Sequence, residues 1–126
     1  MNRFAPAAAA LFAFASAAQV LAETPLERGR YLMQSIVACG NCHTPKGPQG
    51  EPPGMELAGG LKFEEKPFTA YAPNITPDPE TGIGRWSEAA FRRAMHEGLD
   101  REGRHLYPAF PYDHFTRVTD EDLAAL

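Results

Sequence analysis

The chain has 126 residues, with 12 Lys and Arg against 16 Asp and Glu, and its formal net charge is −4 at pH 7. This length gives one small domain, and the acidic balance argues against a nucleic acid or an anionic membrane surface as its partner. Twelve Pro and eleven Gly make the chain rich in loops. A domain of this size and composition has little apolar core of its own.

Residues 1–22 have the pattern of a secretory signal peptide. Arg3 supplies a positive charge, residues 5–18 form a short Ala-rich apolar segment, and residues 20–22 fit a cleavage site. An uncleaved anchor is the alternative, although the apolar segment is short for a membrane span. We therefore expect an exported, periplasmic protein with its mature domain at residues 23–126, and membrane association through a larger complex stays open.

The first element expected in the mature domain is a helix over residues 25–37. Thr24 suits the N-cap position, Pro25 suits the first helical position, and Glu27 completes a capping box. Gly29 lies within this helix and would allow another element to approach it closely. The helix leads directly to the only two cysteines of the chain.

The stretch Cys39-Gly40-Asn41-Cys42-His43 has the C-x-x-C-H spacing of c-type haem attachment. Two thiols three residues apart lie on one face of a helical turn and can both bond one edge of a porphyrin. The imidazole of His43 can then bind the iron as proximal ligand. We predict one covalent haem c, held by Cys39, Cys42 and His43.

Two other interpretations of the same motif are a redox disulfide and half of a zinc site. A zinc site needs two more soft ligands, and the chain has no further Cys. A thiol–disulfide oxidoreductase would have its motif after a strand, whereas a helix is expected before Cys39. Export also agrees with haem attachment, because bacteria attach haem covalently outside the cytoplasm.

Residues 44–84 are expected to form a long loop, because Pro and Gly recur throughout this stretch. Such a composition does not sustain long helices or central strands. A loop of this length is unusual in a compact domain, but it is reasonable where the chain wraps a large, flat, apolar cofactor. Short extended pieces are expected near Leu57 and over residues 62–71.

A second helix is expected from Ser87, its N-cap, to a stop near Gly98. A Pro-rich loop follows at residues 106–112, and Thr119 is the expected N-cap of a third helix. The chain stops about two turns into that helix, which suggests that it is cut short; a frayed natural end is the alternative. The expected fold is all-α, with three main helices and long Pro- and Gly-rich loops wrapping the haem.

This order of elements resembles a mono-haem cytochrome c domain over the whole mature chain. Two stretches sharpen the resemblance, Asn74-Ile75-Thr76-Pro77-Asp78 with Thr81-Gly82-Ile83-Gly84-Arg85-Trp86-Ser87, and Gly103-Arg104-His105-Leu106-Tyr107-Pro108-Ala109-Phe110-Pro111-Tyr112. They are similar to the cytochrome c subunits of periplasmic dehydrogenases that act on alcohols, gluconate, aldehydes or nicotinate-type heterocycles. Those subunits usually have three such domains in tandem, and this chain resembles the first.

The resemblance implies an electron-transfer module without substrate chemistry of its own. It would take electrons from a dehydrogenase subunit and pass them to a further haem domain, a quinone or an oxidase. An alternative is a haem enzyme or a gas-binding haem protein with an open distal site. A ligand-binding test with carbon monoxide would separate the two.

One departure from the family pattern concerns the sixth iron ligand. Many relatives have the distal Met in a Tyr-Pro-Ala-Met-Pro-Tyr context, and this chain has Phe110 there, which cannot bind iron. His114, four residues on, is the favoured replacement, and Met95 is the second candidate. His105 and His96 are weaker candidates, and five-coordinate iron stays open.

Several other residues are candidates for indirect contacts with the haem. Trp86, Asn74 and Tyr71 could line the pocket or hydrogen-bond a propionate, and Arg104 could pair with a propionate through both of its donors. A carbonyl close to Pro45 could accept the imidazole N–H of His43 and orient the ring. Ordinary packing or a solvated surface is the alternative for each of them.

Overall fold

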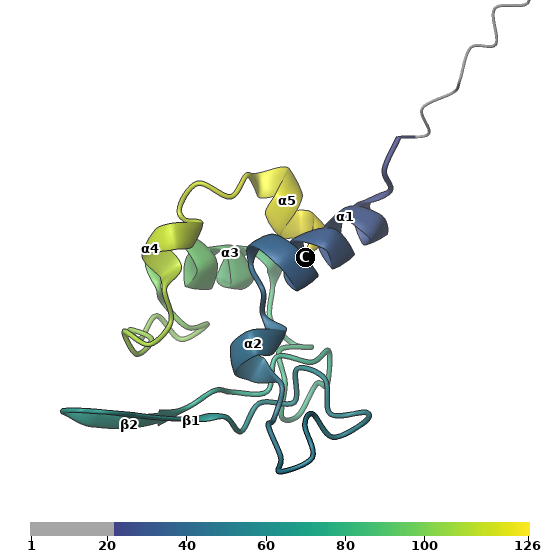
Figure 1. Ribbon diagram of the computed structural model, residues 1–126. Helices are drawn as coiled ribbons and strands as arrows, with labels where there is room; N and C mark the ends of the chain where they lie inside the picture. Colours follow the sequence, from purple (N-terminus) through teal and green to yellow (C-terminus); the bar gives the residue numbers. More distant parts are fainter. Residues whose placement is uncertain (1–21) are drawn as a thin grey trace, which may run out of the picture.

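The computed structural model describes residues 22–126, so residues 1–21 of the expected signal peptide lie outside the described part. Figure 1 shows α1, α3 and α5 grouped in one half of the domain, with α2 and a β-hairpin in the other half. The elements in chain order are α1 (Pro25–Tyr31), η1 (Leu32–Ile36), α2 (Gly40–His43), β1 (Lys62–Glu65), β2 (Phe68–Tyr71), α3 (Glu88–Glu97), α4 (Tyr112–Phe115) and α5 (Asp120–Ala125).

The expected N-terminal helix is confirmed, although its second half is a π-helix. Thr24 accepts the backbone N–H of Glu27, and the Glu27 carboxylate accepts the backbone N–H of Thr24 at 2.9 Å, which completes the capping box. The helical segment ends one residue earlier than expected, at Ile36. Ala38 follows in the left-handed region with φ 51°, and the chain changes direction there before α2.

The long loop over residues 44–84 contains a small antiparallel sheet, so the expectation of an all-α domain is corrected. β1 and β2 pair in the register Lys62↔Tyr71 and Glu65↔Phe68, where an extended piece was expected. The other extended piece, near Leu57, was predicted wrongly. Leu57 has φ 63°, which is left-handed backbone and incompatible with a strand.

The two later helices begin at the residues that the sequence indicated. The Ser87 side chain accepts the backbone N–H of Ala90 at 3.2 Å, and the Thr119 side chain accepts that of Asp122 at 3.2 Å. α3 ends at Glu97, and the following Gly98 has a left-handed φ of 67°, as is common after the last helical residue. Capping therefore fixes the boundaries of α3 and the start of α5.

α1 and α5 cross in close contact at Gly29, as the sequence suggested. A Cβ atom built on Gly29 would lie 1.8 Å from the backbone oxygen of Ala125, so only glycine allows this approach. Beside the crossing, Arg28 donates two hydrogen bonds to the Asp122 carboxylate, at 2.7 and 2.8 Å. This pair of parallel bonds fixes the orientation of the two helices.

The apolar core of residues 22–126 is thin. None of its large side chains is completely enclosed, and half of its buried apolar residues are alanines: Leu32, Ala72, Ala90, Ala94, Met95 and Leu123. A core of this kind contributes little burial of apolar surface. This agrees with the small apolar core that the length and composition indicated. No helix in residues 22–126 has both the length and the apolar character that a membrane span requires.

Candidate functional site

A cavity of about 510 Å³ is lined by residues of α2, of the loop that follows it, of α3 and of α4. This volume falls within the range of sites that hold a small molecule or cofactor, roughly 300–1,000 Å³. Cys39, Cys42 and His43 all line it. Most of the remaining lining is apolar or aromatic, including Val37, Phe63, Ile75, Ile83, Trp86, Phe91, Leu106, Phe110 and Phe115.

The imidazole of His43 is oriented by a backbone carbonyl from a distant part of the chain. Its Nδ1 lies 2.8 Å from the carbonyl oxygen of Pro73. A carbonyl can only accept, so Nδ1 holds the proton and Nε2 keeps its lone pair for a metal. The sequence placed such a carbonyl near Pro45, and the structure assigns the role to Pro73 instead, thirty residues after His43.

Gly59 holds the segment containing Pro73 against the end of α2. Its backbone N–H donates to the carbonyl of His43 at 2.6 Å. It has φ 81°, and a Cβ there would lie 2.5 Å from the carbonyl carbon of Pro73. Glycine is therefore required at this position. Sequence reasoning missed Gly59 and Pro73, since neither residue carries a chemical signal of its own.

The two thiols both lie in the wall of this cavity. Cys39 precedes α2, Cys42 lies within it, and both are free and half-buried. Burial raises the pKa of the Cys39 thiol, whereas a redox-active thiol typically has a lowered pKa. Within residues 22–126, no cluster of three or more His, Cys, Asp or Glu is arranged to hold a metal ion. The zinc and dithiol interpretations therefore gain no support.

Haem fits this arrangement on the chemistry of the residues present. The cavity offers one thiol at the N-cap of α2 and one within α2, an imidazole with a free Nε2, and a mostly apolar lining. Thiols bond the porphyrin covalently, imidazole binds the iron, and the apolar wall suits the flat face of the macrocycle. The three residues of the motif that the sequence singled out are brought together in one site.

The residues expected to line the pocket or to bind a propionate differ in whether their side chains are already hydrogen-bonded to other residues. Trp86 and Tyr71 line the cavity. Asn74 also lines it, but its amide donates to Thr81 at 2.9 Å and accepts the backbone N–H of Thr76 at 2.8 Å. Its side chain therefore stabilises its own turn.

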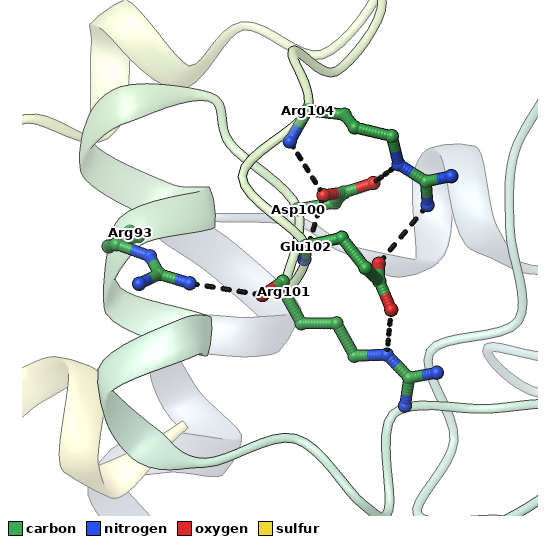
Figure 2. Close-up of polar contacts among 5 residues, drawn as sticks. All are labelled: Arg93, Asp100, Arg101, Glu102 and Arg104. Atoms are coloured by element: carbon green, nitrogen blue, oxygen red, sulfur yellow. Dashed lines mark hydrogen bonds and ion pairs between the residues drawn. The ribbon is translucent and has the colours of Figure 1, made fainter.

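Arg104 belongs to a network of charges at the mouth of the cavity, shown in Figure 2. Its Nε donates to Asp100 at 2.7 Å, its Nη2 donates to Glu102 at 3.1 Å, and its side chain is 74% exposed. The hydrogen bond from the Arg104 backbone N–H, followed by the guanidinium, lowers the pKa of Asp100. Arg93 of α3 donates to the Arg101 carbonyl at 3.2 Å. A propionate would have to compete with these two carboxylates for Arg104.

The candidates for the distal ligand differ in whether they line the cavity. The side chain of His114 is 76% exposed, lies 3.8 Å from Asp113, and does not line the cavity. Met95 is buried and lines it. His96 is directed elsewhere, with Nε2 2.9 Å from the carbonyl of Val118. Phe110 lines the cavity and packs against Phe115, with ring centroids 5.7 Å apart.

Fold and site together define a small haem-binding domain with a C-x-x-C-H attachment motif. The family model for cytochrome c matches residues 26–126, and the chain belongs to the cytochrome c family. Domains of this family bind haem c covalently and transfer electrons through it, and this chain is such a domain. The resemblance seen in the sequence is confirmed.

Proteins similar to this chain are much longer than it is. A subunit of nicotinate dehydrogenase from Pseudomonas putida is 54% identical over 101 residues, which are 80% of this chain and 8% of that protein. The cytochrome c subunit of a quinone alcohol dehydrogenase from Gluconacetobacter polyoxogenes is 40% identical over 116 residues, 87% of this chain and 23% of that subunit. The gluconate 2-dehydrogenase cytochrome c subunit of Pantoea cypripedii is 42% identical over 101 residues, 80% of this chain and 21% of that subunit.

Proposed function

We propose that the domain binds one haem through Cys39 and Cys42, with His43 as proximal ligand, and relays electrons from a dehydrogenase subunit. The observation that carries the proposal is that these three side chains line one apolar cavity, with Nδ1 of His43 fixed by Pro73. When bound, the haem supplies a one-electron Fe(III)/Fe(II) couple. The protein does no substrate chemistry of its own.

The residues of the chain support this role in three ways. Pro73 accepts the N–H of His43 at 2.8 Å, which fixes the orientation of the ring and leaves Nε2 as the nitrogen that can bind iron. The aromatic and aliphatic lining excludes water from the cofactor. Exposed aromatic residues at the rim of the cavity, Tyr71 and Tyr107, leave its edge accessible to a partner.

The donor and the acceptor are inferred from the relatives. Similar chains occur within proteins named as subunits of nicotinate, alcohol and gluconate dehydrogenases. We propose a dehydrogenase subunit as the donor, and a further haem domain, a quinone or an oxidase as the acceptor. The protein would be exported to the periplasm and held in a dehydrogenase complex that associates with the membrane.

The test is to express the protein in the periplasm with the haem maturation machinery and record oxidised and reduced spectra. We expect covalent haem that is reduced by dithionite and, in the presence of the partner dehydrogenase, by its substrate. The variant Cys39→Ala/Cys42→Ala should lose covalent haem, while Met55→Leu, at an exposed site outside the cavity, should keep it. Haem that is absent from the parent protein, or retained by the double variant, would contradict the proposal.

A second candidate function is supported by Phe110, which faces the cavity without a donor atom. A haem protein with an open distal position binds small ligands such as carbon monoxide. Rapid binding of carbon monoxide to the reduced protein, combined with slow reduction by a dehydrogenase, would favour this function. A relay with six-coordinate iron should resist the ligand.

A further inference from the structure

We infer that the Met95 thioether is the sixth ligand of the haem iron, in place of the loop methionine that Phe110 replaces. The inference rests on the proposed function, since it requires haem bound by Cys39, Cys42 and His43. Met95 comes from a helix rather than from the loop over residues 106–111, so the ligand has moved to another element of the cavity wall.

His43 and Met95 reach the cavity from two different elements. His43 is the last residue of α2, and Met95 lies in the final turn of α3. Figure 1 shows α2 and α3 as separate elements, with α2 below α3 in this view, and both residues line the same cavity. Two ligands of one iron have to come from different parts of the cavity lining, and α2 and α3 are two such parts.

Few other lining residues carry an atom that binds haem iron. The usual donors are His, Met, Cys and Tyr, and beyond the C-x-x-C-H motif only Met95, Tyr71 and Tyr107 among the lining residues are of these types. The two tyrosines are 63% and 58% exposed, and Tyr107 stacks on Phe68 with centroids 5.2 Å apart. Met95 is 5% exposed, as expected for an enclosed ligand.

The remaining histidines are directed away from the cavity. His96 is held by the carbonyl of Val118, and His114 is exposed next to Asp113. His105 is exposed and lies outside the cavity lining. None of the three lines the cavity.

The surroundings of Met95 suit a ligand that has to adjust its position. Its neighbour Ala94 and the preceding Ala90 are buried and small, and the three rotatable bonds of a methionine side chain let its sulfur reach into irregular space. Phe110 is packed against Phe115 in the lining of the same cavity. In this arrangement Phe110 contributes to the apolar lining, and Met95 supplies the donor.

The test compares Met95→Leu with two controls, Met33→Leu and His114→Ala, in the haem-containing protein. We expect the oxidised parent protein to be low-spin, with the far-red charge-transfer band of a Met–iron bond. Met95→Leu should lose that band, have a lower reduction potential, and bind carbon monoxide at least tenfold faster. Both controls should keep the band and the potential of the parent.

A second substitution covers the case in which Met95→Leu does not fold. Met95→His should give a low-spin spectrum without the far-red band, because imidazole would occupy the same position. The inference is overturned by a parent protein without the far-red band, by persistence of the band in Met95→Leu, or by its loss in His114→Ala. In each of these cases the haem stays covalently bound, so the proposed function stands; absence of covalent haem would remove both.

Discussion

Replacing Gly29 by alanine should destabilise the domain, because Gly29 is the point at which α1 and α5 cross. The added Cβ would lie 1.8 Å from the backbone oxygen of Ala125 and 2.7 Å from its carbonyl carbon, whereas ordinary contact begins near 3.4 Å. The clashing atoms belong to the backbone of Ala125, so no side-chain rotation can relieve the clash. The two helices would have to separate by roughly 1.5 Å to accept the methyl group.

Two effects of opposite sign decide the magnitude. Overpacking costs about 1–3 kcal/mol, and a clash with backbone belongs at the upper end of that range. Alanine in place of glycine within a helix contributes about 1 kcal/mol of stabilisation. The expected net loss is about 2 kcal/mol, which lowers the melting temperature of a domain of this size by about 10 °C. Separation of the helices would also lengthen the bonds between Arg28 and Asp122.

The assay is denaturant and thermal unfolding of the haem-containing protein, followed by far-ultraviolet circular dichroism. Ala89→Gly, at an exposed position of α3, is the control that measures helix propensity alone, and it should cost about 1 kcal/mol. The backbone clash predicts that Gly29→Ala lowers the free energy of unfolding, whereas helix propensity alone predicts that it raises it. Stabilisation or no change in Gly29→Ala would refute the close crossing of α1 and α5.

Three further predictions concern capping, acid stability and loop order. Ser87→Ala should lower the free energy of unfolding by about 1 kcal/mol, because it removes the N-cap of α3; thermal unfolding measures this. The bond from Arg28 lowers the pKa of Asp122 below its ordinary value of 3.8, so its stabilising contribution is present above that pH and is lost as the pH falls through the lowered pKa. Asp122→Asn should therefore be less stable at pH 7, and the difference should narrow in unfolding measured below pH 3.8. Asp100→Ala should speed tryptic cleavage after Arg101, since it removes the acceptor that orders the turn.

Each of these has a matched control. Ser35→Ala changes a serine outside any cap and should stay within about 0.5 kcal/mol of the parent. Asp113→Asn removes a carboxylate whose partner is 3.8 Å away, and it should leave acid stability unchanged. Glu64→Ala removes the exposed ion pair with Lys62 and leaves the hydrogen bonds to Asp100, so its rate of cleavage after Arg101 should match the parent. Each prediction is contradicted if the variant and its control change the measured stability or cleavage rate by the same amount.

Local signals in the sequence were sufficient for the helices and the motif. Thr24, Ser87 and Thr119 each cap the helix that the sequence assigned to them, because a cap depends on residues only three positions apart. The C-x-x-C-H spacing likewise needs no long-range information. The close approach at Gly29 was also anticipated, since a glycine within a helix is costly unless packing requires it.

Contacts between distant segments were beyond the sequence alone. The orientation of His43 depends on the carbonyl of Pro73, and any residue type offers a carbonyl. The left-handed backbone at Leu57 is equally invisible, because leucine rarely adopts it. His114 was favoured for its nearness to Phe110 in the chain, but α4 leaves its side chain exposed. Its role as ligand stays a prediction that the spectrum of His114→Ala tests.

The most direct test of the central claim is mass spectrometry of the tryptic peptide over residues 31–46, from protein matured in the periplasm. Cleavage after Arg30 and Lys46 isolates the whole C-x-x-C-H motif in one peptide. The account predicts one haem bound to this peptide through two thioether bonds, with no free thiol left to alkylate. A peptide without haem, with both Cys39 and Cys42 alkylated or joined as a disulfide, would contradict it.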